Sequence, residues 1–111
     1  MGKRGFEPAL GPYEHDYRSP EYKTDSMLRK NYGITLAQYD QMLLTQRNGC
    51  LICGKSPEEN GRRLAVDHDH ASGMVRGLLC SNCNSALGKF QDDPVLLRAA
   101  AEYLESYAVS E

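Results

Sequence analysis

The stretch that decides the fold covers residues 50–88 and reads CLICGKSPEENGRRLAVDHDHASGMVRGLLCSNCNSALG. It contains two CxxC pairs, Cys50 with Cys53 and Cys80 with Cys83. A two-residue spacer lets one tight turn place two thiolates on the same ion, and four cysteines complete the tetrahedron of a closed, structural site. The sequence therefore predicts a structural Zn²⁺ held by these four side chains.

A redox function for the cysteines fits the sequence less well. A thiol oxidoreductase uses one CxxC pair that follows a strand in a βαβ unit, whereas this chain has two pairs and no such unit. The pairs lie further apart than the roughly 15–20 residues of a usual zinc ribbon. A β-hairpin between the pairs accounts for the extra length.

Two short β-prone runs, residues 64–66 and 74–79, lie between the cysteine pairs. The turn-prone residues 71–73 separate the runs, which suits a hairpin. A helix is expected over residues 82–90, where the chain leaves the second cysteine pair. The segment between and after the cysteines therefore predicts two strands followed by a helix.

Further helices are expected on both sides of this segment. Residues 25–32 predict a short helix closed by Gly33, and Thr35 is a candidate N-cap for a second helix through about residue 46. A last helix is expected from Pro94 to about residue 107. The second and last helices carry apolar stripes that we expect to pack in the core. The stripes consist of Leu36, Tyr39, Met42, Leu43 and Gln46 on one helix, and Leu96, Leu97, Ala100, Ala101 and Leu104 on the other.

The composition fits one small globular domain, since the 111 residues are 41% hydrophobic and 25% charged. We assign residues 1–24, with their prolines, glycines and tyrosines, to an extended N-terminal arm, and residues 25–111 to the zinc-stapled domain. No stretch is long and apolar enough for a membrane span, and the first ten residues lack the apolar core of a secretory signal. We therefore expect a cytoplasmic protein with no membrane partner.

A net charge of -2 argues against a strongly basic nucleic-acid-binding protein. The charge is unevenly distributed, however, because basic residues gather around the cysteines and histidines. These residues are Arg47, Lys55, Arg62, Arg63, Arg76 and Lys89. A local basic face that binds nucleic acid is therefore compatible with the overall charge.

The run Asp67-His68-Asp69-His70 follows an apolar strand and holds two of the three histidines. A lone histidine is usually a structural residue, but two histidines and two aspartates between closed zinc knuckles indicate a hydrolytic metal site. Strict alternation along a strand would place Asp67 and His68 on opposite faces. The strand must therefore end or bulge here if both side chains act on one phosphate.

Several motifs together resemble the recombination endonuclease VII family of HNH nucleases, in order and in spacing, over about residues 31–105. They are Cys50-x-x-Cys53, Asp67-His68-Asp69-His70, Val75-Arg76-Gly77-Leu78-Leu79-Cys80, Cys83-Asn84, Ala86-Leu87-Gly88 and Asp92-Asp93-Pro94. The resemblance implies an α+β fold in which the hairpin and the helix near Cys83 form a ββα-metal (HNH, His-Me finger) unit. The four-cysteine zinc site staples this unit, and helices flank it.

The resemblance also implies the roles of the site residues. Asp67 and Asn84 correspond to the protein ligands of a catalytic Mg²⁺ or Mn²⁺, which keeps several waters and recruits phosphate oxygens. His68 corresponds to the general base that takes a proton from the attacking water, because imidazole exchanges protons near neutral pH. His70 shares a strand face with His68 and is expected to contact the scissile phosphate or to orient the substrate.

Three further side chains have weaker expectations. Arg76 and Lys89 are candidate phosphate contacts, although an exposed arginine or lysine often has no specific partner. Asp69 is expected to fix a histidine or a backbone amide rather than to bind metal. The resemblance thus assigns catalysis to His68, His70 and Asn84.

The expected function is metal-dependent hydrolysis of DNA phosphodiester bonds. The match ends with the last helix, so nicking or double-strand cleavage is expected ahead of the resolution of branched DNA. Such compact proteins are often encoded by phages, which would place this one in the cytoplasm of a bacterial host as a monomer or homodimer. Two alternatives stay open: a non-catalytic zinc-ribbon module that binds nucleic acid, and an HNH accessory protein that is active only within a larger phage assembly.

Overall fold

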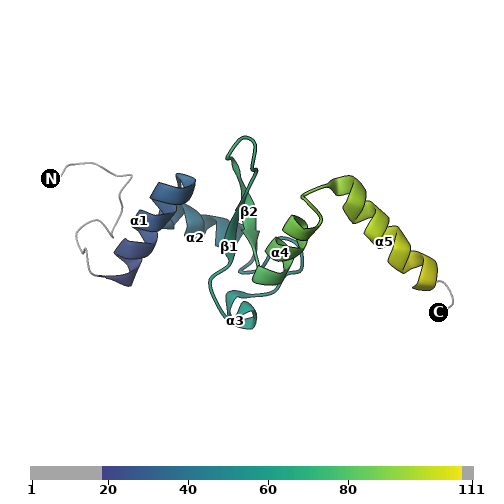
Figure 1. The fold of residues 1–111 in the computed structure, drawn as a ribbon. Helices are drawn as coiled ribbons and strands as arrows, with labels where there is room; N and C mark the ends of the chain where they lie inside the picture. The colour runs from purple at the N-terminus through teal and green to yellow at the C-terminus, as the bar shows by residue number, and fades with distance from the viewer. Residues whose placement is uncertain (1–18, 109–111) are drawn as a thin grey trace.

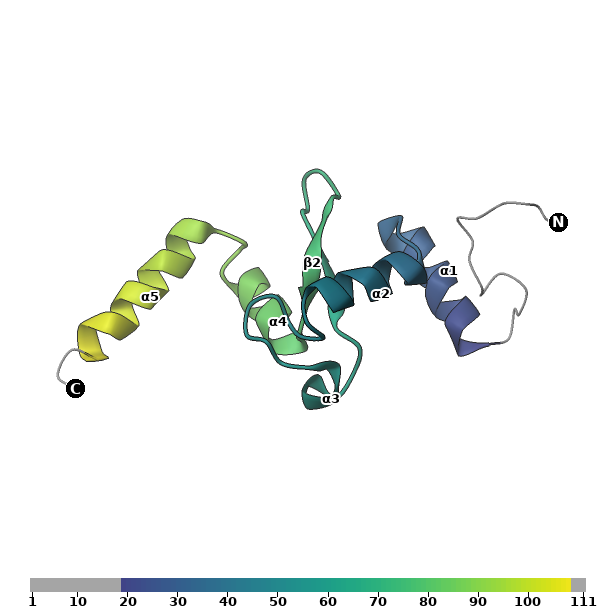
Figure 2. The ribbon, with the colours of Figure 1, turned by 180° about the vertical axis from the view of Figure 1, so that it is seen from behind.

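The computed structural model describes residues 19–108 and shows a small α+β protein built around one antiparallel hairpin (Figure 1). Its elements, in chain order, are α1 (Pro20–Tyr32), α2 (Leu36–Thr45), α3 (Pro57–Asn60), β1 (Ala65–His68), β2 (Val75–Leu79), α4 (Ser81–Lys89) and α5 (Pro94–Ala108). The hairpin lies in the middle of the molecule, with α1 and α2 on one side and α4 and α5 on the other (Figures 1 and 2). The predicted order of two strands followed by a helix is confirmed.

The hairpin is irregular at the position where a bulge or a strand end was expected if Asp67 and His68 act on one phosphate. Asp67 pairs with Gly77, but the next residue, His68, pairs with Val75, so the register passes over Arg76. This bulge interrupts strict alternation beside Asp67 and His68. The hairpin loop is closed by the side chain of Asp69, which accepts a hydrogen bond from the backbone N–H of Ser72 at 2.8 Å. Asp69 therefore fixes a backbone amide, as predicted.

The core lies where α1 and α2 pack against the hairpin and the cysteines. Its buried members are Leu28, Leu36, Tyr39, Cys50, Leu64, Val66, Leu78, Leu79 and Cys80. The hydroxyl of Tyr39 on α2 donates a hydrogen bond to the carbonyl of Leu64 just before β1. The carboxylate of Asp25, buried in α1, accepts a hydrogen bond of 2.8 Å from the backbone N–H of Leu36 and so joins the two helices. These contacts fix α1 and α2 against the hairpin.

Helix α2 begins where the sequence predicted, but α1 begins earlier. The side chains and backbones of Thr35 and Gln38 form the capping box that starts α2. Helix α1 begins at Pro20, with Ser19 as its N-cap, rather than at residue 25. The assignment of residues 20–24 to an extended arm is therefore wrong, because serine followed by proline is itself a helix start. The rest of the expected arm, residues 1–18, lies outside the described residues.

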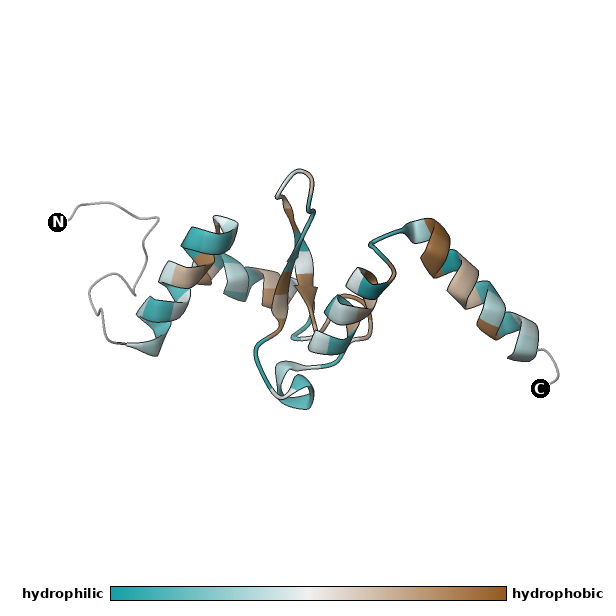
Figure 3. Cartoon of the chain, in the orientation of Figure 1, coloured by the Kyte–Doolittle hydropathy of each residue, from teal (hydrophilic) through white to brown (hydrophobic). Residues whose placement is uncertain are grey.

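Helix α5 does not pack as the sequence predicted. It points away from the hairpin in both views, and it carries hydrophobic residues along its length (Figures 1, 2 and 3). The exposed fraction is 38% for Leu96 and 67% for Leu104. Gln91 and Asp92 adopt left-handed backbone conformations, with φ of 59° and 54°, between α4 and α5. The prediction that this stripe lies in the core is wrong, because the turn directs α5 away from the hairpin.

Candidate functional site

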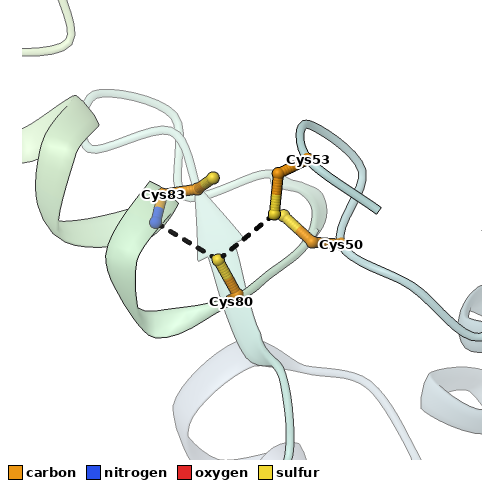
Figure 4. A group of neighbouring side chains, drawn as sticks. All are labelled: Cys50, Cys53, Cys80 and Cys83. Carbon is orange, nitrogen blue, oxygen red and sulfur yellow. Dashed lines mark hydrogen bonds between the residues drawn. The ribbon is translucent and has the colours of Figure 1, made fainter. Parts of the chain in front are cut away.

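The four cysteines form a cluster whose geometry fits a tetrahedral metal ion (Figure 4). Their Sγ atoms all lie within 4.8 Å of one another, and those of Cys53 and Cys80 are 3.7 Å apart. Zinc bound to sulfur at about 2.3 Å requires sulfur atoms about 3.8 Å apart on the edges of a tetrahedron. The four cysteines are thus positioned to hold a structural metal such as zinc.

Tight backbone turns place the two pairs opposite each other. In the first knuckle the backbone N–H of Gly54 donates to the carbonyl of Cys50 at 2.9 Å. A Cβ on Gly49 would lie 2.5 Å from the carbonyl oxygen of Gly54, so this approach requires glycine. In the second knuckle Cys80 ends the hairpin and caps α4, since its Sγ accepts from the N–H of Cys83 at 3.4 Å. The second pair is therefore built into the junction between β2 and α4.

The thiols have unequal affinities for protons. Burial acts to raise the pKa of Cys50, but hydrogen bonds from backbone N–H groups, that of Cys53 first, outweigh it and lower the pKa to about 6. Burial raises the pKa of Cys83 to about 12, and the neighbouring sulfur atoms add to the shift. Cys50 is therefore poised to be a thiolate at neutral pH, whereas Cys83 loses its proton when a metal binds.

A second group of polar side chains lines a cavity of about 230 Å³ between the hairpin and α4. The cavity brings together Asp67, His68 and His70 from the hairpin and Asn84 from the first turn of α4. All four were predicted as site residues from the sequence. Among residues 19–108, the cysteine cluster is the one group of at least three Cys, His, Asp or Glu side chains close enough to share an ion.

Asp67 and Arg76 form a two-pronged ion pair across the hairpin. Arg76 donates from Nε to Oδ2 of Asp67 at 2.7 Å and from Nη2 to Oδ1 at 3.0 Å. The hydrogen bond to Asp67 raises the pKa of Arg76 above its usual value. Arg76 also reaches Asp92 at 3.3 Å. Arg76 was expected to bind phosphate, and in this structure its guanidinium instead bridges two carboxylates.

The two histidines of the run lie side by side. Their ring centroids are 5.2 Å apart in an edge-to-face arrangement, although β1 ends at His68 and His70 lies in the loop that follows. His68 also contacts the ring of Tyr32 at the end of α1, with centroids 5.7 Å apart. His70 is more exposed, and its Nε2 lies 3.6 Å from Oδ2 of Asp92. Helix α1 therefore helps to hold His68 in place through Tyr32.

Sequence reasoning missed two residues with polar side chains in this cavity, Asp92 and Tyr32. Asp92 was named only within the matched motif Asp92-Asp93-Pro94, without a role in the site. The left-handed backbone at Asp92 turns its carboxylate toward Arg76 and His70. Tyr32 carried no signal, because its contact with His68 joins distant parts of the chain. Lys89 lies exposed at the end of α4 and does not line the cavity.

The fold and the site thus define a small α+β protein with a four-cysteine cluster that could hold a metal and with a separate polar cavity. The family model of recombination endonuclease VII matches residues 25–106, and the chain belongs to this family.

Similar proteins occur in mycobacterial phages. The chain is 37% identical over 102 residues to the Gene 59 protein of Mycobacterium phage L5 and 35% identical over 102 residues to the Gene 59 protein of Mycobacterium phage D29. Each alignment covers 87% of this chain and 60% of the relative, so the chain spans less than two thirds of these proteins. Within residues 19–108, no helix is long and apolar enough to cross a membrane.

Proposed function

We propose that this protein is a metal-dependent DNA endonuclease of the HNH (ββα-metal, His-Me finger) type that hydrolyses phosphodiester bonds. The observation that carries the proposal is the shared cavity, in which Asp67, His68 and His70 from one hairpin meet Asn84 from the following helix. This arrangement of strand, strand and helix provides oxygen ligands and imidazoles at one point. Family membership supports nuclease chemistry independently of the cavity.

Asp67 and Asn84 are the proposed ligands of a catalytic Mg²⁺ or Mn²⁺. One carboxylate and one amide suit an ion that retains waters and takes up phosphate oxygens, and it would stabilise the charge that develops during hydrolysis. Both carboxylate oxygens of Asp67 accept hydrogen bonds from Arg76. A cation at Asp67 would therefore compete with Arg76 for these oxygens, and an Arg76 side chain displaced from Asp67 would be available to a substrate phosphate.

His68 is the proposed general base. It is held against Tyr32, which limits the orientations of the ring, and it lines the same cavity as Asp67. A nearby water bound for in-line attack would lose its proton to this imidazole. His70, paired with Asp92, is proposed to contact the scissile phosphate or to orient the substrate.

Zinc at the four cysteines has a structural role in this proposal, because all four positions are taken by protein thiolates. The expected substrate is DNA that is nicked or cut in both strands, with branched DNA as a further candidate. Since the relatives come from phages, we place the protein in the cytoplasm of an infected bacterium, as a monomer or homodimer.

The decisive experiment incubates the purified protein with supercoiled plasmid and Mg²⁺ or Mn²⁺, beside an EDTA control. Wild-type protein is expected to nick the plasmid only with added metal. His68→Ala should lose cleavage by roughly 10²–10⁴-fold, the usual contribution of a general base, while zinc content and DNA binding stay unchanged. Normal turnover by this variant would remove His68 from the mechanism. DNA binding without cleavage by the wild type would instead favour a non-catalytic zinc-ribbon module.

A further inference from the structure

A second cavity, of about 550 Å³, adjoins the catalytic one. The two share the walls formed by Tyr32, Ala65, Val66 and Asn84. The shared residue Asn84 is also a proposed ligand of the catalytic ion. Anything that fills the larger cavity therefore lies directly beside the site of cleavage.

The polar wall of this second cavity carries positive charge. Arg62 and Arg63, in the segment between α3 and β1, both line it and are both exposed. Neither arginine has a carboxylate partner among the side chains of residues 19–108. The guanidinium of Arg63 lies over the ring of Tyr39, 5.5 Å from its centroid, which orients this side chain without neutralising it. Ser81 and Ser85 add hydroxyl groups from α4.

We propose that this cavity binds the sugar–phosphate backbone of duplex DNA next to the cleaved bond, and that Arg62 and Arg63 contact two neighbouring, uncleaved phosphates. The inference rests on the proposed function, because the cavity would contact the same DNA strand that the adjoining site cleaves. Charge complementarity carries it: in a chain of net charge -2, two unpaired arginines stand beside the catalytic site. Guanidinium groups match phosphate oxygens in geometry, and such contacts position DNA without reading its sequence.

The test measures DNA binding in EDTA, so that it does not depend on cleavage. The double variant Arg62→Gln/Arg63→Gln keeps the side-chain length and removes both charges. Each lost phosphate contact lowers the slope of log affinity against log salt by about 0.9, so the double variant should lose about 1.8. Between 50 and 200 mM salt, wild-type affinity should then fall about twelvefold more than that of the variant. Arg98→Gln on α5 removes one charge outside the cavity and should leave the slope unchanged.

A second measurement locates the contact on the DNA. A duplex with a neutral methylphosphonate beside the cleavage position should bind wild-type protein more weakly than the unmodified duplex. The double variant should bind both duplexes equally, because the contact that the modification removes is already absent. Thermal melting checks the fold of each variant, and Arg62→Gln alone, with an expected slope change of about 0.9, replaces the double variant if the loss of Arg63 disturbs Tyr39.

The outcomes separate the two proposals. Metal-dependent cleavage by wild type together with an unchanged salt slope in the double variant would overturn the phosphate contact and leave the proposed function intact. A wild-type protein that neither binds nor cleaves DNA would overturn the proposed function and this inference with it. Binding by wild type without cleavage, but with the predicted slope change, would support the DNA contact and reject the nuclease.

Discussion

Replacing Cys80 by serine tests the structural metal without removing a helix cap. Cys80 is 1% exposed, its Sγ lies 3.7 Å from that of Cys53, and it accepts the hydrogen bond that starts α4. Serine is itself a preferred N-cap residue. The substitution therefore keeps an acceptor for the N–H of Cys83 and removes chiefly the thiolate.

The size of the effect follows from the ligand count. Structural zinc contributes about 10–16 kcal/mol to small zinc-dependent peptides, which is roughly 2.5–4 kcal/mol for each of four thiolates. A buried hydroxyl without a full set of partners costs about a further 1–3 kcal/mol. Because a small domain is stable by only about 5–15 kcal/mol in total, Cys80→Ser should leave most of the protein unfolded or marginally folded.

The assay combines zinc content with thermal melting followed by circular dichroism. Wild type should carry one zinc per chain and melt cooperatively, and stoichiometric chelation should abolish the transition. Asn82→Ala, an exposed change within the same knuckle, should keep both properties. A wild-type protein that melts unchanged after its zinc is removed would refute the structural role of the cluster.

Three further predictions concern packing, pH and the catalytic cavity. Gly49→Ala should destabilise the protein by about 1–3 kcal/mol in urea denaturation, because its Cβ would lie 2.5 Å from the Gly54 carbonyl oxygen. Gly88→Ala in α4, whose Cβ meets nothing within 4 Å, should stabilise the protein by about 0.5–1 kcal/mol. If both substitutions changed the stability in the same direction, the close backbone approach at Gly49 would not be the cause. Burial raises the pKa of Tyr39 from 10.0 to about 12, so its contribution to stability is present below pH 10 and is lost as the pH rises toward 12. That loss amounts to about 2.7 kcal/mol and should be missing in Tyr39→Phe, so an equal alkaline loss in both proteins would exclude this phenol as its source. Arg76→Ala removes from Asp67 an ion pair that is worth up to about 1 kcal/mol. Calorimetry should therefore show Mn²⁺ binding that is up to about fivefold tighter. Weaker binding would show that Arg76 does not compete with the cation.

Features governed by neighbouring residues could be predicted from the sequence. The capping box of Thr35 and Gln38 depends on residues three apart, and the sequence correctly identified Thr35 as its start. The bulge beside Asp67 and His68 followed from requiring two adjacent strand residues to act at one point, and the register shift lies there. Local chemistry determines both features, so a single sequence is enough to find them.

Features that depend on which elements meet could not be predicted in the same way. The periodicity of Leu96 and Leu104 shows that α5 has an apolar face, but it does not show what covers that face, and both side chains are exposed. Similarly, Arg76 could be identified as a candidate site residue, whereas its pairing with Asp67 and Asp92 depends on hairpin register and on a left-handed turn. Periodicity and motifs identify which residues are apolar or belong to the site, and the tertiary arrangement determines which side chains they contact.

The cysteine cluster and the polar cavity are separate sites, yet they share one structural element. Cys80 ends β2 and starts α4, and its carbonyl accepts the hydrogen bond from the N–H of Asn84 at 3.0 Å. Asn84 therefore lies one helical turn beyond a metal ligand, while the strand that carries Asp67 and His68 is paired to β2. A shift of Cys80 would move both walls of the cavity, because α4 and the hairpin meet at that residue. In the proposed nuclease, a metal at the four cysteines would fix the geometry of the cavity without taking part in hydrolysis, because it would hold the junction from which the hairpin and α4 extend.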